Sequence, residues 1–258
     1  MDSFATWILR GLYEKQGKSR LSQISDLIDW VPIRHTLDEM YDNILMFKIL
    51  ILQQWFGLND LEVERQMADR ISFMSFLGFP DPIPDSRTVW LFKKRMEETG
   101  KDEMVWAELQ RQLDAMGLQV RRGTIQDATF IEADHGSSKK PRGEGAKIRR
   151  SRDGTWAKKG KKSYFGYKLH QKTDIDYGLI REIETTTAKP LGELDKERNR
   201  LISILRSPGE RPHAVIKRVF GAGRVLVTTV RRVQVKMMVT AFAFNLYQLC
   251  TLKNANVI

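Results

Sequence analysis

Residues 123–131, which read GTIQDATFI, mark a change from helical to extended patterning in this chain. The stretch is rich in β-branched residues, which fit a pleated sheet, and it predicts a strand. The residues before it, as far as Gly117, carry the apolar spacing of helices. We therefore expect an α+β fold with an all-helical domain at residues 1–118 and a second domain at residues 119–252.

Helical signals fill the first of these domains. Residues 36–55 have the apolar pattern of a mostly buried helix. Asn59 is expected to cap a helix over residues 60–69, and a further helix is expected over residues 101–115. Local sequence signals are therefore enough to predict most of this domain as helices.

After the Gly- and Pro-rich stretch 78–84, Asp85 or Ser86 is expected to cap a basic helix that runs to about Glu98. Two interpretations of this region remain open. One is a loose helix-turn-helix that contacts DNA, and the other is a helical bundle with a basic surface helix. In the first interpretation the candidate DNA-binding residues are Arg87, Lys93 and Lys94.

After residue 131 the pattern changes again. Residues 134–162 are polar and basic without periodicity, and we expect a loop or arm. Residues 164–173 and 179–187 alternate and predict two strands joined by an Asp- and Gly-containing turn. The expected elements that follow are helices over 193–206, 208–219 and 233–249 and a short extended run over 225–230.

Composition and charge narrow the classes of protein. The single cysteine, Cys250, excludes a disulfide framework and any CxxC metal site and favours a reducing compartment. The apolar run 44–56 is too short to span a membrane and the N-terminus lacks the features of a secretory signal, so we expect a cytoplasmic protein. Residues 1–120 hold 14 Lys and Arg against 19 Asp and Glu, whereas residues 121–258 hold 29 against 13. This asymmetry favours a polyanion partner for the second half, the alternative being a solubilising surface.

Two carboxylates carry the candidate chemistry. Asp127 lies inside the strand predicted at residues 123–131, where an acid is costly to bury without a partner. Glu210 belongs to the string Arg206-x3-Glu210-x6-Lys217, which places Glu210 and Lys217 on nearly the same side of a helix. Carboxylates from a strand and a helix are the ligands of a two-metal phosphoryl-transfer site, and oxygen ligands suit Mg²⁺ or Mn²⁺.

With these residues in view, the sequence resembles the DDE transposases of prokaryotic insertion sequences. The strand of the family's first catalytic aspartate resembles Asp-Ala-Thr at 127–129. The family's second strand resembles KKGKKSYFGYKLH at 158–170, and its glutamate helix resembles SPGERPHAVIKRVFGAGRV at 207–225. Residues 41–97 are similar to the family's N-terminal region. The resemblance implies a ribonuclease-H-like second domain in which Asp127 and Glu210 ligate Mg²⁺ or Mn²⁺.

One part of the family's pattern is missing. The second catalytic aspartate, in a context like Tyr-x-Asp-x-Gly-Tyr, is expected between the third strand and the glutamate helix, but the chain passes directly from Thr187 to Leu191. The Tyr that usually stands three residues before the Arg is Ser203 here. The resemblance thus implies an internally deleted, truncated ribonuclease-H-like domain. The acids that could replace the missing aspartate are Asp174, Asp176, Glu184, Glu193 and Asp195.

Each candidate also has a structural interpretation. Asp127 could pair with Arg121 or Arg122, and Glu210 could close a capping box with Ser207. Asp174 and Asp176 are typical turn residues, and Glu193 and Asp195 are typical of a helix start. Arg206 and Lys217 could be solvated charges. The aromatic residues beside the lysines of 158–162 fit either base stacking or core packing.

The resemblance implies a transposase that cuts and joins DNA strands at the ends of its element. Its expected partners are the terminal inverted repeats and further copies of itself on DNA, with no membrane. The candidate DNA-binding residues of the second half are Arg206, Lys217, Lys158, Lys159, Lys161 and Lys162. The alternatives are a catalytically dead remnant that binds ends or inhibits an intact copy, and a product that does not fold because the truncated sheet exposes its edges.

Overall fold

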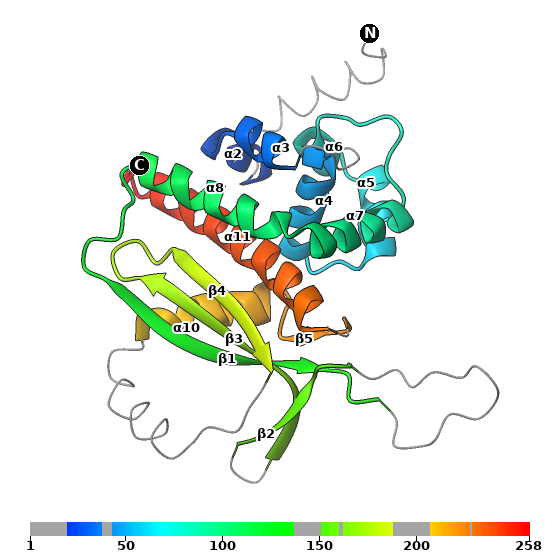
Figure 1. The fold of residues 1–258 in the computed structure, drawn as a ribbon. Coiled ribbons are helices and arrows are strands. Elements are labelled where there is room, and N and C mark those ends of the chain that lie inside the picture. Colours follow the sequence, from blue (N-terminus) through cyan, green and yellow to red (C-terminus); the bar gives the residue numbers. More distant parts are fainter. Residues whose placement is uncertain (1–19, 38–42, 137–150, 160–161, 188–206, 228) are drawn as a thin grey trace, which may run out of the picture. The chain divides into compact units, whose positions relative to one another are not determined.

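The computed structural model describes all of the chain except residues 1–19, 38–42, 137–150, 160–161, 188–206 and 228 (Figure 1). It contains both helices and a curled sheet, so the expected α+β class is confirmed. Contacts divide the chain into two compact units, one formed by Met1–Gln119 with Phe242–Ile258 and the other by Val120–Ala241. The C-terminal segment, expected within the second domain, thus groups with the helices by its contacts.

The first unit is helical throughout its described part. The buried helix expected at residues 36–55 is α4, Asn43–Trp55, and its apolar side chains form much of this unit's core. Asn59 accepts a hydrogen bond from the Glu62 N–H at 2.8 Å, and Asp85 accepts one from Thr88 at 2.7 Å, so both helix caps are confirmed. The other helices are α2 (Arg20–Leu27), α3 (Trp30–Thr36), α5 (Asp60–Asp69), α6 (Ile71–Leu77), α7 (Ser86–Thr99) and α8 (Lys101–Ala115).

The second unit is built on a five-stranded sheet with the order β2-β3-β1-β5, and β4 pairs with the far end of β3 (Figure 1). Strands β1, β3 and β4 are those that the sequence predicts. They pair antiparallel, whereas β5 runs parallel to β1. The strands are β1 (Thr124–Ala133), β2 (Thr155–Lys159), β3 (Lys162–Asp174), β4 (Ile180–Thr187) and β5 (Arg224–Val225).

Strand β2 corrects the expectation that residues 134–162 are loop or arm. Its residues pair antiparallel with β3, from Thr155 opposite Gly166 to Lys159 opposite Lys162. The polar, basic sequence of β2 hides this strand, because the pairing is supplied by β3 rather than by local patterning. The rest of the expected arm, residues 137–150, lies outside the described residues.

Two described helical elements lie between β4 and β5 in the chain. Helix α10, Ser207–Ala214, continues into the π-helix η2, Val215–Val219, and α10 packs against β1 and β3. They correspond to the helix expected at residues 208–219, whereas the helix expected at 193–206 lies outside the described residues. The extended run expected at 225–230 is confirmed only at its start, where β5 ends at Val225.

Helix α11, Val230–Asn254, is longer than the helix expected at 233–249. Within the second unit its Gln234 side chain accepts a hydrogen bond from the Thr185 N–H at 2.7 Å and donates one to the Ile183 carbonyl at 3.2 Å. The free edge of β4 is thereby partly satisfied by a helix side chain, which is one way in which proteins protect sheet edges.

Helix α11 is also the one described helix whose length and composition would allow it to cross a membrane. In its most apolar stretch 78% of the residues are buried, as in the core helix of a soluble protein. Residues 233–249 were expected to form a helix but were not considered as a membrane span, and the absence of a membrane span stays a prediction.

Candidate functional site

Asp127 lies on the face of β1 that is turned toward the interior of the second unit. Along β1 the side chains at 125, 127 and 131 are less exposed than their neighbours, as the alternation of a strand requires. The Asp127 side chain is 14% exposed. Directly across on β3 is Gln171, whose side chain is buried and whose Oε1 has no hydrogen-bond partner in the described structure.

His213 of α10 meets this carboxylate. Its Nε2 lies 3.3 Å from Asp127 Oδ2, and its side chain is 9% exposed. Neither ring nitrogen has the geometry of a hydrogen bond to any described residue. The contact therefore brings a helix face against the predicted catalytic aspartate. Of the two arginines that its structural interpretation named, Arg121 and Arg122, the second has its guanidinium bonded to Asp176.

His213 was not among the residues expected at the site, although the sequence holds a signal for it. Glu210-Arg211-Pro212-His213 has the Glu-x-x-His spacing, which places a carboxylate and an imidazole on one side of a helix. Glu210 itself belongs to α10, but its side chain lies outside the described residues, as does that of Ser207. The catalytic and capping interpretations of Glu210 both stay predictions.

Lys217 lies in the π-helical turn η2 rather than in a regular α-helix. The wider i to i+5 winding lowers the rotation per residue, so the α-helical spacing argument does not carry over unchanged to Lys217, and its placement relative to Glu210 stays a prediction. Its Cβ and Cγ lie about 3.5 Å from the position that a Cβ would take at Gly223. Gly223 in turn accepts a hydrogen bond from Glu132 at the far end of β1. Lys217 thus lies beside the end of β1, whereas His213 lies beside Asp127.

The basic residues of the second unit are described only in part. Lys158 and Lys162 are exposed at the end of the β2–β3 hairpin. Trp156, on the same strand as Lys158, is 52% exposed, and its ring lies 5.8 Å from that of His135. The exposed indole of Trp156 fits the base-stacking interpretation, whereas Phe165 and Tyr167 are buried and fit core packing. Arg206, Lys161 and the side chain of Lys159 lie outside the described residues.

Helix α7 of the first unit presents a mixed basic and apolar surface. Arg87 and Lys94 are exposed, and between them Trp90 is exposed as well. Lys93 instead pairs with Asp60, which also accepts a hydrogen bond from Gln53. The charge of Lys93 is therefore neutralised by Asp60 within the unit, which makes Lys93 a poorer candidate for a phosphate contact. Helices α6 and α7 are joined through the 78–84 stretch, and both the helix-turn-helix and the bundle interpretation remain open.

The two acids of the β3–β4 turn have structural roles in this fold. Asp174 is fully buried, and its Oδ2 lies 3.0 Å from Arg181 Nε while Oδ1 accepts the Tyr177 N–H at 2.6 Å. Asp176 bonds the side chain and backbone of Arg122, and these bonds lower the pKa of its carboxyl. Neither acid is placed to replace the missing aspartate beside Asp127, in agreement with their interpretation as turn residues.

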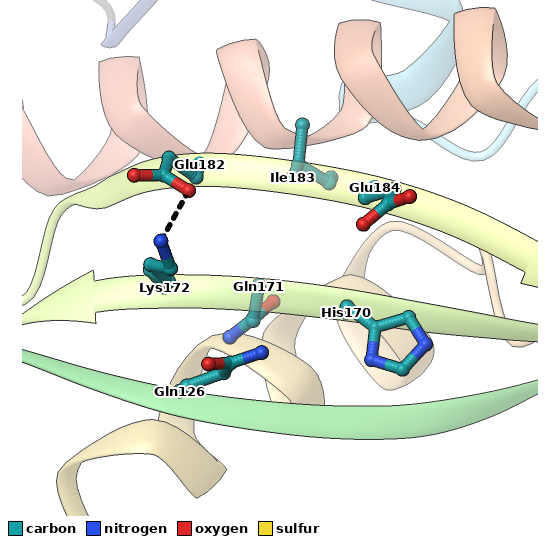
Figure 2. Close-up of a pocket in the computed structure, with 7 residues that line it drawn as sticks. All are labelled: Gln126, His170, Gln171, Lys172, Glu182, Ile183 and Glu184. Atoms are coloured by element: carbon teal, nitrogen blue, oxygen red, sulfur yellow. Dashed lines mark ion pairs between the residues drawn. The ribbon is translucent and has the colours of Figure 1, made fainter.

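A hollow of about 90 Å³ opens between β1, β3 and β4 (Figure 2). Its titratable residues point to the opposite face of the sheet from Asp127 and Gln171, because side chains alternate between the two faces along a strand. They are His170, Lys172, Glu182 and Glu184. Lys172 pairs with Glu182 at 2.6 Å, and His170 lies opposite Glu184, which places that candidate acid away from Asp127 as well. Burial, with a contribution from Lys168, lowers the pKa of His170.

The described residues do not assemble the expected two-metal site. Within them, no three His, Cys, Asp or Glu side chains gather to hold an ion. Around Asp127 they supply one carboxylate, one imidazole and the amide oxygen of Gln171, whereas two bridged Mg²⁺ ions require several oxygen ligands. Glu193 and Asp195 lie outside the described residues.

Comparison with known families adds one finding. The family described as a transposase domain (DUF772) matches residues 11–95, about a third of the chain. The match supports a transposase family. It falls within the helical unit and overlaps residues 41–97, where the sequence resembles the N-terminal region of insertion-sequence transposases. No solved structure matches the chain.

Proposed function

We propose that this chain is a DNA-binding protein of an insertion-sequence transposase lineage, with a ribonuclease-H-like framework of the DDE type in its second unit. The observation that carries the proposal is the transposase-domain match over residues 11–95 in a chain whose other half is strongly basic. The placement of α10 against Asp127 supports it further, because the DDE framework requires the glutamate helix beside the first aspartate.

DNA recognition is proposed to rest on exposed basic groups of both units. In the second unit these are Lys158 and Lys162 with the exposed ring of Trp156, which fit phosphate contacts and base stacking. In the first unit they are Arg87 and Lys94 of α7. The predicted contributions of Lys159, Lys161, Arg206 and Lys217 rest on charge and motif spacing. The proposed ligand is the DNA of the element's inverted repeats, bound by more than one copy of the chain.

Strand cleavage and joining by two metal ions is the activity of the intact family. Asp127 and Glu210 are the residues that would contribute to such a site here. The described side chains do not fit a two-metal centre. A specific observation therefore favours the remnant as a second candidate function. Two of the candidate replacement acids, Asp174 and Asp176, are paired with Arg181 and Arg122. A third, Glu184, lies opposite His170 on the other face of the sheet from Asp127.

DNA binding can be tested without any cleavage. Fluorescence anisotropy in EDTA should show binding to element-end duplex with an affinity that falls steeply with salt. The double variant Lys158→Gln/Lys162→Gln should weaken binding and reduce the slope of log affinity against log salt by about 2. The matched control is Arg111→Gln, which removes a surface charge paired with Glu108 on a helix of the acidic half. A salt-independent affinity, or equal effects of both variants, would contradict the proposal.

Cleavage separates the two candidate functions. Labelled element-end DNA is incubated with the protein and Mn²⁺, and 3′-hydroxyl nicks are measured. Nicks that disappear in Asp127→Ala support an active transposase. Salt-dependent binding without nicks supports the remnant, and the absence of both contradicts the proposed function altogether.

A further inference from the structure

The Asp127–His213 contact has the separation of an ion pair but not the geometry of a hydrogen bond. A charge-assisted hydrogen bond between imidazolium and carboxylate is about 2.7–2.9 Å long. Here Nε2 and Oδ2 are 3.3 Å apart, and the orientation is not that of a hydrogen bond. Both side chains are largely buried, and a buried imidazole without hydrogen bonds is costly. The arrangement therefore calls for a third group.

A shared metal ion accounts for the separation. Transition-metal bonds to imidazole nitrogen and carboxylate oxygen are about 2.0–2.2 Å long, and ligands at octahedral to tetrahedral angles then lie about 2.8–3.6 Å apart. The observed 3.3 Å falls inside this interval. Gln171, the cross-strand neighbour of Asp127, presents a buried Oε1 without a hydrogen-bond partner among the described residues, so the surroundings are polar and unsatisfied.

We propose that Asp127 and His213 are the protein ligands of a single divalent transition ion, held between β1 and α10. An imidazole ligand favours Mn²⁺, Co²⁺ or Zn²⁺ over Mg²⁺, which binds almost entirely to oxygen. The Glu-x-x-His spacing of Glu210 and His213 is that of helical carboxylate–imidazole metal sites. The site differs in ligand set from the expected carboxylate pair and holds one ion rather than two. It does not require the chain to bind or cut DNA.

Metal binding to the full-length chain, stripped with EDTA and transferred to chelator-free buffer, tests this directly. Mn²⁺ binding is followed by the loss of the free-ion electron paramagnetic resonance signal, and Co²⁺ binding by its visible absorption. We expect one ion per chain, and Mg²⁺ in tenfold excess should not displace it. Asp127→Asn and His213→Gln should each weaken metal binding by at least about tenfold. Even the loss of a residue that only hydrogen-bonds a metal ligand weakens binding by about this much. His170→Gln is the matched control, because that imidazole lies on the other face of the sheet and bonds Thr186.

A ligand swap guards against variants that merely fail to fold. In His213→Asp the nitrogen ligand becomes oxygen, so Mg²⁺ should then compete with Mn²⁺ and raise the thermal unfolding midpoint, as any ligand of the native state does. Absence of stoichiometric binding to the wild-type chain overturns the inference. An unchanged metal affinity in His213→Gln also overturns it, and so does full competition by Mg²⁺ for the site in the wild type. Anisotropy measured in EDTA reports DNA binding separately, so failure of the metal site is distinguishable from failure of the proposed function.

Discussion

Asp174→Ala tests whether the acid of the β3–β4 turn stabilises the fold, as its contacts indicate, or serves as a substitute for the missing aspartate. The side chain is fully buried, and the side chain of its partner Arg181 is only 8% exposed. The substitution removes the 3.0 Å contact to Arg181 Nε and the 2.6 Å hydrogen bond from the Tyr177 N–H. It also removes the buried carboxylate that balances the charge of the Arg181 guanidinium, which is the larger cost.

Breaking a buried ion pair by removing one partner costs about 3–5 kcal/mol. This is a large fraction of the roughly 5–15 kcal/mol that stabilises a typical domain. With a urea m-value of about 2 kcal/mol per M, the unfolding midpoint of Asp174→Ala should fall by about 2 M. The measurement is urea unfolding followed by circular dichroism. The m-values of the wild type and the variant are compared, because an equal m-value shows that the shifted midpoint reports a change in stability.

Glu182→Gln provides the control from the same hairpin. Glu182 pairs with Lys172 on the surface, where an exposed ion pair contributes about 1 kcal/mol or less. If Asp174→Ala shifted the midpoint no further than Glu182→Gln, the structural role of Asp174 would be refuted. Removing both buried partners should cost less than removing Asp174 alone, because no unpaired charge then remains.

Two further predictions concern the same sheet. Gly166→Ala should prevent stable folding of the second unit, because an added Cβ would lie 2.0 Å from the Ile131 carbonyl oxygen; a cooperative thermal unfolding transition close to that of the wild type would contradict it. The pKa of His170 is lowered in the folded state by burial, so the unfolded chain takes up the proton first as the pH falls. The contribution of His170 to the free energy of unfolding should be fully present above about pH 6.5 and should decline below that pH toward the folded pKa. The free energy of unfolding measured between pH 5 and 8 should therefore depend less steeply on pH in His170→Gln. An unchanged pH dependence in the variant would exclude His170 as its cause.

Local signals in the sequence were sufficient for much of the fold. The caps at Asn59 and Asp85 are formed by side chains that bond N–H groups only three residues further along, so neighbouring residues decide them. Strand β1 and the β3–β4 hairpin follow from alternation and turn residues within a few positions. Asp174 and Asp176 could be assigned to the turn for the same reason.

Interactions between distant segments decided the rest. The basic residues of β2 form a strand because β3 supplies their hydrogen bonds, and no pattern within β2 predicts that pairing. The π-helical turn at Lys217 changed the rotation on which the Glu210–Lys217 spacing depended.

The candidate site shows the division most clearly. The sequence by itself singled out Asp127, as an acid within a strand, and Glu210, as part of a spaced motif. Only the tertiary structure placed His213 at 3.3 Å from Asp127, because that distance depends on how α10 packs across β1 and β3. Burial then leaves the imidazole without a hydrogen bond to any described residue, and this environment, which no linear pattern encodes, makes the pair a candidate metal site.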